Sequence, residues 1–154
     1  MINTMKEKVL KLLDGAHVKY ELIKLPDDIS LDVAEHMKFH ERSMKYALAT
    51  MIYSTEKGFV AVQRRGDTKV SSKKLREFLG IKRLSLASKE ELGQMGLQIG
   101  LVPPVGLDMP IYADNKMLEL DEIYTGAADN EYGMHTTPKG LFRVNHAVMG
   151  DFTE

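Results

Sequence analysis

The strongest constraint on the fold is a pair of apolar segments separated by a short polar turn. Residues 47–54, ALATMIYS, form an apolar run of strand length, and residues 59–63, FVAVQ, form a second one. The residues Glu56-Lys57-Gly58 between them are typical of a tight turn. This pattern predicts a β-hairpin in the middle of the chain.

Helices and further strands are expected on both sides of this hairpin. Apolar residues at helical spacing, with Ser or Thr at N-cap positions, predict the helices. Their expected places are residues 4–14, residues 31–38 after Ser30, a segment from Ser71 or Ser72 to Leu79, a segment after Ser88, and a short segment from Thr137. Further strands are expected at residues 17–24, 83–87, 111–114 and 120–123. The mixture predicts an α+β fold with a mixed sheet rather than a doubly wound one.

The size and composition of the chain limit its class. The 154 residues fit a single domain spanning residues 1–154. The absence of cysteine excludes a disulfide framework, a thiolate metal site and a cysteine nucleophile. Lysine and glutamate interrupt the apolar residues of the N-terminal segment, so we expect no signal peptide. No stretch approaches the ~20 apolar residues that span a bilayer. We therefore expect a cytoplasmic protein without a membrane partner.

The charge is unevenly distributed along the chain. The formal net charge of −1 argues against a general electrostatic nucleic-acid binder, and we expect no DNA partner. The segment Arg64–Arg83, however, holds eight basic and two acidic side chains. Such a segment could contact several backbone phosphates, or it could be the solvated face of a helix with its flanking turns. The candidate phosphate-binding residues are Arg64, Arg65, Lys69, Lys73, Lys74 and Arg76.

Residues 93–110 contain four glycines and three prolines but are too apolar for a solvated linker. They predict an ordered loop packed on the core. Within it, Gly100-Leu101-Val102-Pro103-Pro104 combines a permissive glycine with two prolines that stiffen the chain. A rigid loop with a few exposed N–H groups could hold a carbonyl oxygen or an oxyanion. A plain structural turn is the alternative.

Three other places carry candidate chemistry. Lys45 directly precedes the apolar strand, where its ammonium group could bind phosphate, polarise a carbonyl or simply be solvated. Asp129 follows the small residues Gly126-Ala127-Ala128 and could accept a hydrogen bond from a ligand or form a turn. His36 and His40 have a metal-ligand spacing, but the segment reads HMKFH rather than HExxH. We expect neither a metal nor another cofactor.

An ordered set of motifs resembles a known family. The stretch GFVAVQRRGDTKVSSKKLREFLGIKRLSLASKEEL, followed by GLVPPVGLDMPIYAD, resembles the YbaK family of aminoacyl-tRNA deacylases and the editing domains associated with prolyl-tRNA synthetase. The order also matches: a hairpin, a Gly-Asp turn, a basic helix, a strand ending in Leu-Ala-Ser, a helix, a GxxxP loop, and a strand ending in Asp. The resemblance covers about residues 30–145. It implies an α+β fold around a curved mixed β-sheet with flanking helices.

The resemblance also implies a site. The GxxxP loop of the family matches Gly100–Pro104 of this chain, which implies that Gly100 and Leu101 take part in catalysis. The resemblance also implies that the basic segment faces the acceptor stem of the tRNA. Family members usually carry a lysine at the start of the strand, where this chain has Ala49. Lys45, four residues earlier, is the candidate for that role. The implied substrate-binding residues are Thr50, Val102, Pro103, Pro104, Gly126 and Asp129.

Three functions are compatible with these residues. The first is a trans-editing deacylase that releases a small amino acid from mischarged aminoacyl-tRNA, with a synthetase as a further partner. The second is a non-catalytic module that docks aminoacyl-tRNA or a synthetase. The presence of Ala49 in place of the usual lysine favours this second function. The third is a hydrolase of a small free ester or amide, which needs no basic surface.

Overall fold

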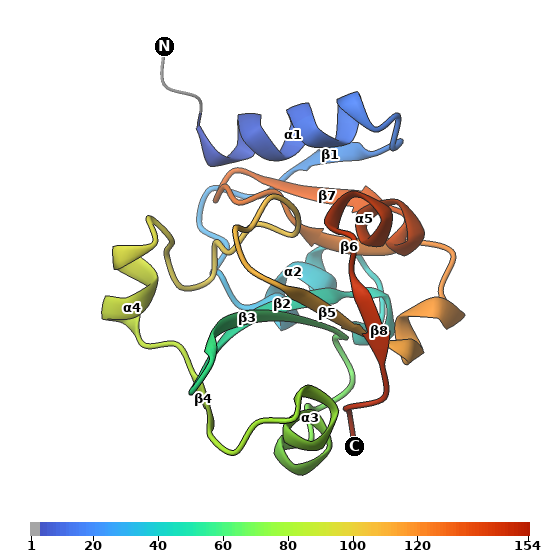
Figure 1. Ribbon diagram of the computed structural model, residues 1–154. Helices are drawn as coiled ribbons and strands as arrows, with labels where there is room; N and C mark the ends of the chain where they lie inside the picture. The colour runs from blue at the N-terminus through green and yellow to red at the C-terminus, as the bar shows by residue number, and fades with distance from the viewer. Residues whose placement is uncertain (1–3) are drawn as a thin grey trace.

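Two β-sheets form the framework of residues 4–154, the part of the chain that the computed structural model describes (Figure 1). The three-stranded sheet has the order β1-β7-β6 and is antiparallel. The five-stranded sheet has the order β4-β2-β3-β5-β8 and is mixed, because β3 and β8 both run parallel to β5. The strands are β1 (Glu21–Lys24), β2 (Leu48–Thr55), β3 (Gly58–Arg65), β4 (Leu84–Leu86), β5 (Ile111–Asp114), β6 (Ile123–Gly126), β7 (Tyr132–Thr136) and β8 (Val148–Gly150).

The predicted hairpin is the centre of the five-stranded sheet. β2 and β3 pair along their full length. β4 pairs with β2 only at Tyr53–Thr55, so none of the described strands covers the first half of the outer edge of β2. A single bridge between Ala47 and Tyr124 links this end of the hairpin to the three-stranded sheet. The open edge of β2 therefore lies where the two sheets meet.

The helices begin and end where the sequence provides caps. The Ser71 hydroxyl accepts the N–H of Lys74, and Gly80 ends the same helix with a φ of +66°. Ser88 forms the predicted capping box with Glu91. The α-helices are α1 (Met5–Gly15), α2 (Val33–Phe39), α3 (Ser72–Leu79), α4 (Lys89–Gln94) and α5 (Pro138–Asn145), and 3-10 helices span Met44–Tyr46 and Asn115–Glu119.

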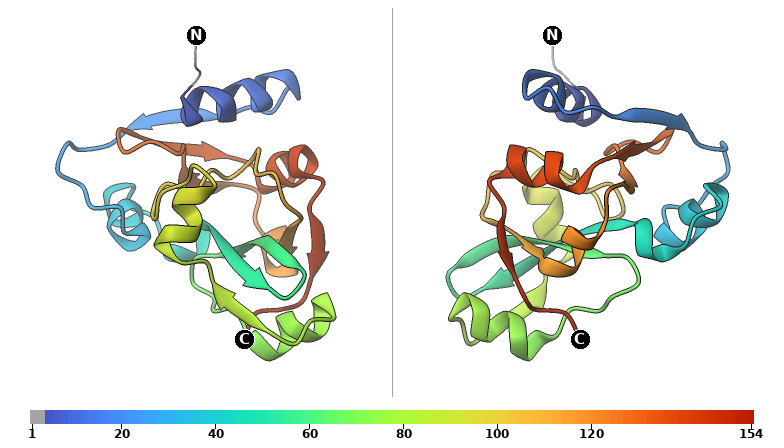
Figure 2. Two further views of the ribbon diagram at one scale, coloured as in Figure 1. Left: turned by 60° about the vertical axis from the view of Figure 1, so that its left-hand side comes forward. Right: turned by 90° about the vertical axis from the view of Figure 1, so that its right-hand side faces the viewer.

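The main hydrophobic core lies between the two sheets, where α1 and α5 close it. Leu13 of α1, Met134 of β7 and Leu141 of α5 are fully buried in this cluster. A second cluster, which includes Leu75 and Phe152, packs α3 on the other face of the five-stranded sheet. Helices α1 and α3 accordingly lie at opposite ends of the molecule (Figure 1, Figure 2). None of the helices in residues 4–154 has the length and apolar character that crossing a membrane requires.

The predicted α+β fold is confirmed, with local differences. The resemblance implied one curved sheet, whereas the strands divide into two sheets. β7 and β8 were not predicted, because Gly133 breaks the apolar pattern of β7 and β8 has only three residues. β6 begins at Ile123, where the sequence indicated that a strand would end. Helix α2 is capped by Asp32 rather than Ser30, since the Asp32 carboxylate accepts the N–H of Ala34 at 3.0 Å.

Candidate active site

A pocket of about 220 Å³ opens at the uncovered edge of β2. Its walls come from four parts of the chain: α2 with the residue Leu31 before it, the open end of the β2–β3 hairpin, the loop at residues 100–102, and residues 125–129. Most of the lining side chains are apolar, and a few polar groups project among them, as is usual in ligand sites. The polar lining residues are His36, Thr50, Arg64, Thr125 and Asp129.

The structure brings together most of the substrate-contacting residues that the sequence predicted. The loop contributes three, the hairpin contributes one, and the end of β6 with the residues after it contributes two. Ala49, at the place where a lysine is usual, lies in the same lining. The predicted residues that meet here are Thr50, Gly100, Leu101, Val102, Gly126 and Asp129.

Glycine is required at the start of the loop for two reasons. Gly100 has a φ of +84°, a conformation that L side chains rarely adopt. A Cβ atom at this position would also lie 2.9 Å from the Cβ of Leu31, which is another wall of the pocket. The N–H of Leu101 donates to the carbonyl of Gln98 at 3.0 Å, which fixes the direction of the loop.

Pro103 and Pro104, predicted to bind substrate, do not line this pocket but belong to the end of the loop that is anchored to the core. Pro103 borders a different groove, which it shares with Met5 and Leu107. The buried Pro104 turns its carbonyl inward, where the side-chain amides of Gln63 and Asn145 donate to it at 2.8 Å and 2.9 Å. The stiff end of the loop is therefore anchored to both β3 and α5.

Gln63 is a site residue that the sequence analysis missed. Its side chain is fully buried, and its Nε2 donates both to Pro104 O and to the hydroxyl of Thr50, at 3.1 Å. Because a carbonyl can only accept, Pro104 O fixes which end of the amide faces Thr50. The Thr50 oxygen is thus an acceptor in this bond, and no acceptor for its own proton is found in residues 4–154. A glutamine within the apolar strand FVAVQ is the signal that could have revealed it.

The pocket contains one charged group of each sign. Asp129 accepts the N–H of Glu131 with one carboxylate oxygen and lies 3.4 Å from the Lys6 ammonium with the other. Arg64 is half-buried, and its Nη1 donates to the carbonyl of Thr68 at 2.8 Å. Arg64 forms no ion pair with any residue in 4–154. The sequence placed Arg64 on the outer tRNA-binding segment and gave no indication that it lines the pocket.

The structure does not bring Lys45 to this pocket. Residues Met44–Tyr46 form a 3-10 helix rather than an extension of β2, with Ser43 as the cap. This turn leaves the Lys45 side chain exposed, and the pocket lining does not include it. Among the residues that line the pocket, the Lys or Arg side chain is therefore Arg64, on the neighbouring strand.

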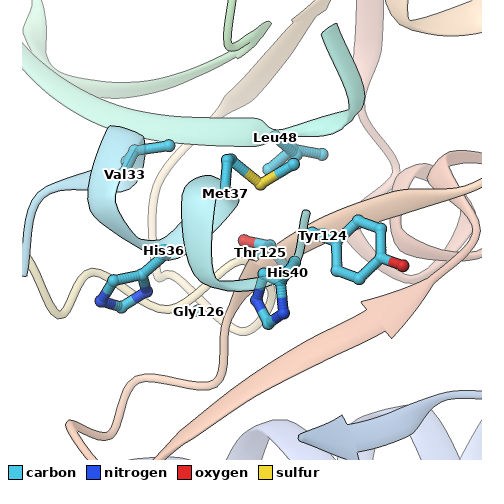
Figure 3. Close-up of a pocket in the computed structure, with 8 residues that line it drawn as sticks. All are labelled: Val33, His36, Met37, His40, Leu48, Tyr124, Thr125 and Gly126. Carbon is cyan, nitrogen blue, oxygen red and sulfur yellow. The ribbon is translucent and has the colours of Figure 1, made fainter. Parts of the chain in front are cut away.

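His36 and His40, at the C-terminal end of α2, make different contacts, although both line a smaller pocket beside the 220 Å³ one. His36 lines the pocket, and its Nε2 lies 2.7 Å from the carbonyl of Ser30. His40 stacks on the ring of Tyr124, with 4.7 Å between the ring centroids (Figure 3). Burial lowers the pKa of His40 below its usual value, and the nearby His36 and His135 add to this effect. The His40 ring thus packs the C-terminal end of α2 against β6, whereas His36 bonds to the segment before α2.

Several cations of the predicted tRNA-binding segment already have ion-pair or hydrogen-bond partners within the protein. Arg65 is paired with Asp67 and Glu119 at 2.6 Å and 3.0 Å. Lys74 donates to the carbonyl of Thr153 at 2.9 Å. Arg76 donates to the carbonyl of Ser72 at 3.2 Å, whereas Lys69 and Lys73 are exposed. The outer surface therefore offers fewer free cations than the sequence count suggested.

The comparisons with known proteins agree on one family. The family model of the aminoacyl-tRNA editing domain matches residues 30–144. The chain belongs to the aminoacyl-tRNA editing domain family, as its resemblance to the YbaK family predicted. The proline–tRNA ligase of Persephonella marina is 33% identical over 132 residues, which cover 78% of this chain and 23% of the ligase. The chain thus spans less than a quarter of the length of that curated relative.

Solved structures confirm the fold. A structure described as that of a proposed trans-editing enzyme for prolyl tRNA synthetase superposes with a TM-score of 0.84 at 23% identity and covers 100% of this chain and 99% of that chain. The hypothetical protein APE2540 gives a TM-score of 0.86 at 24% identity, covering 96% of this chain and 100% of that one. The family match supports the predicted editing function on aminoacyl-tRNA.

Proposed function

We propose that this protein hydrolyses the ester bond of mischarged aminoacyl-tRNA and that the 220 Å³ pocket binds the aminoacyl group. The observation that carries the proposal is the convergence of the 100–102 loop, Thr50 and Asp129 on this pocket, in a chain that belongs to the editing-domain family. The apolar walls suit a small side chain such as that of alanine, serine or proline. The protein would act in the cytoplasm, where tRNA is charged.

The polar groups of the pocket fit the parts of an aminoacyl ester. The Asp129 carboxylate is the group of opposite charge to the substrate's α-ammonium. The Thr50 proton, freed because Gln63 donates to the Thr50 oxygen, is suited to donate to the ester carbonyl. In the loop, the N–H of Leu101 is already used by Gln98, whereas those of Gly100 and Val102 have no hydrogen-bond partner in residues 4–154.

The reaction needs no strong side-chain base, because an aminoacyl ester is already activated. A water molecule adds through its oxygen to the carbonyl carbon, and the oxyanion that forms accepts hydrogen bonds from Thr50 and the loop. The bond to the ribose oxygen then breaks, and that oxygen takes up the proton that the water loses. The products are a free amino acid and uncharged tRNA. Holding the ester in place supplies most of the acceleration in this scheme.

The groups outside the pocket would bind the rest of the tRNA. Lys45 is exposed beside the hairpin and would contact a backbone phosphate rather than the ester. Lys69 and Lys73 are exposed and would meet the acceptor stem, together with Lys74 and Arg76. A synthetase is a further proposed partner, because the matching region in the Persephonella marina relative is part of a proline–tRNA ligase.

A deacylation assay tests this function. The protein is incubated with a panel of tRNAs charged with small amino acids, and release of the amino acid is followed against buffer. The proposal expects release for at least one mischarged tRNA, and release for none would refute it. The non-catalytic alternative predicts salt-dependent tRNA binding without turnover. Replacing Lys73, Lys74 and Arg76 with alanine distinguishes a hydrolase of small free esters from the two tRNA-dependent functions. The substitutions should weaken tRNA binding and tRNA deacylation but leave the hydrolysis of a small free ester unchanged.

A further inference from the structure

Two adjacent arginines of β3 have opposite surroundings. Arg65 is only 16% exposed and is neutralised by Asp67 and Glu119. Arg64, whose side chain leaves the other face of the strand, has no carboxylate partner in residues 4–154 and lines the pocket. A half-buried guanidinium without a counter-charge is available to pair with an anionic ligand. The contrast singles out Arg64 rather than the basic segment as a whole.

The Arg64 guanidinium is held in place by one of its nitrogens. Nη1 donates to the carbonyls of Arg65, Gly66 and Thr68 at 3.3 Å, 3.4 Å and 2.8 Å. No hydrogen bond of Nε or Nη2 to another residue is found in the described part of the chain. The group is thus oriented in advance, and its remaining N–H donors suit the planar, two-oxygen geometry of a phosphate.

The strand register explains how Arg64 reaches the pocket. Ala49 of β2 lies directly opposite Arg64, and both residues line the pocket on the same face of the hairpin. Because Ala49 carries only a methyl group, it leaves space beside Arg64 on this face of the strand pair. A large side chain at residue 49 would occupy that space. The small residue and the long cation are complementary across the strand pair.

The pocket also keeps its two charges apart. Asp129 is engaged by Lys6 and by the N–H of Glu131, and it forms no ion pair with Arg64. A pocket with a separate anion and a separate cation fits a ligand that carries both an ammonium and an anionic group. The aminoacyl end of a tRNA has this composition, since its α-ammonium is followed through the ribose by a phosphodiester.

We propose that Arg64 is an anion-binding residue of this pocket and that its ligand is the phosphate on the 5′ side of the terminal, aminoacylated nucleotide. The proposal rests on the proposed function for the identity of the nucleotide. It assigns the substrate's phosphate to a residue inside the pocket, whereas the surface lysines contact phosphates farther along the acceptor strand. Arg64 thereby sets how far the ester enters the pocket.

The test compares two minimal substrates that differ only in this phosphate. Alanyl-adenosine and alanyl-adenosine 5′-monophosphate, both esterified on the ribose, are hydrolysed by the wild type, by Arg64→Gln and by Lys89→Gln. Lys89 is exposed on α4, away from the pocket lining, and controls for the loss of one positive charge. Because a charge-assisted hydrogen bond is roughly twice as strong as a neutral one, the wild type should prefer the phosphorylated substrate in KM by about ten- to a hundredfold. Arg64→Gln should abolish this preference, and Lys89→Gln should keep it.

A charge transplant separates anion binding from a structural role. In the double variant Ala49→Lys, Arg64→Gln, the cation moves to the opposite residue of the same strand pair. If Arg64 binds phosphate, the preference returns in the double variant. If Arg64 only tethers the turn at residues 65–68, Ala49→Lys restores nothing and the proposal is overturned. Preservation of the preference in Arg64→Gln alone would overturn it as well.

A binding measurement keeps this proposal distinct from the proposed function. Adenosine 5′-monophosphate and adenosine are titrated into wild-type protein while the NMR signal of the Arg64 Nε–H group is followed. A shift with the monophosphate, but not with adenosine, supports the anion site even if the protein hydrolyses no ester. Hydrolysis of both minimal substrates without a phosphate preference, together with an unmoved Arg64 signal, would refute the site and leave the deacylase function standing.

Discussion

Replacing Gln63 with methionine should separate the stability of this protein from its activity. The variant loses the two bonds that Nε2 donates, at 2.8 Å to Pro104 O and at 3.1 Å to Thr50 Oγ1. Each is worth about 1 kcal/mol. It also removes the buried Gln63 Oε1, which has no hydrogen-bond partner in the described residues. Such an orphaned acceptor costs about 1–3 kcal/mol, so its removal offsets much of the loss.

The remaining contacts explain why the fold should tolerate the change. Methionine has nearly the volume of glutamine, and Asn145 still donates to Pro104 O at 2.9 Å. We therefore expect the free energy of unfolding to change by no more than about 1 kcal/mol, measured by urea denaturation. Gln63→Glu should behave differently, since a buried carboxylate facing the Pro104 carbonyl would cost about 3 kcal/mol or more.

The activity of the Gln63→Met variant should fall although its fold is intact. The Thr50 hydroxyl loses the donor that orients it, and the loop loses its anchor on β3. Because small misplacements of a catalytic group are costly, the single-turnover rate of deacylation should fall by about ten- to a hundredfold. Asn145→Leu is the matched control, since it removes the other donor to Pro104 O without touching Thr50. Wild-type turnover in Gln63→Met, or an equal loss in Asn145→Leu, would contradict the role given to Thr50.

Three further changes test other parts of the structure. Gly100→Ala forces a side chain into a φ of +84° and towards Leu31, and should lower the free energy of unfolding by about 2–3 kcal/mol in urea titrations. Lys45→Ala should weaken tRNA binding and reduce the slope of log K against log salt by about one, with an unchanged single-turnover rate at saturation. The backbone N–H groups of Arg83 and Lys82 lower the pKa of Glu56 from 4.5 to about 2. The carboxylate therefore stabilises the fold above pH 4.5, and this stability is lost as the pH falls towards 2. Glu56→Gln should flatten the dependence of the melting temperature on pH in that window, and an unchanged dependence would show that Glu56 does not contribute.

The sequence predicted best those features that depend on local chemistry. The capping box of Ser88 and Glu91 and the Gly80 end of α3 occur where the sequence placed them, because a cap needs only neighbours along the chain. The hairpin was also visible, since its strands are adjacent in sequence. β7 and β8 were not visible, because short strands are stabilised by partners that the sequence does not identify.

The sequence located the loop that lines the pocket, but it did not indicate which cation lines it. The family pattern located Gly100–Val102, and the structure gathers Thr50 and Asp129 around this loop. The sequence offered only Lys45 for the cation and gave no indication that Arg64 lines the pocket. The 3-10 turn that leaves Lys45 exposed is local, but the cross-strand position of Arg64 depends on the register of two strands, which the sequence does not state.

The position of the pocket at the junction of two sheets links these observations. β2 contributes an edge that β4 leaves uncovered, and β6 of the other sheet approaches that edge through the bridge between Ala47 and Tyr124. An uncovered strand edge is usually a hazard, because its free backbone groups can pair with another chain. Here α2 lies over the edge, with His40 stacked on Tyr124, so that only a small opening remains. The same uncovered strand edge that needs protection therefore provides the space in which, under the proposed function, Thr50 and Arg64 would contact the substrate.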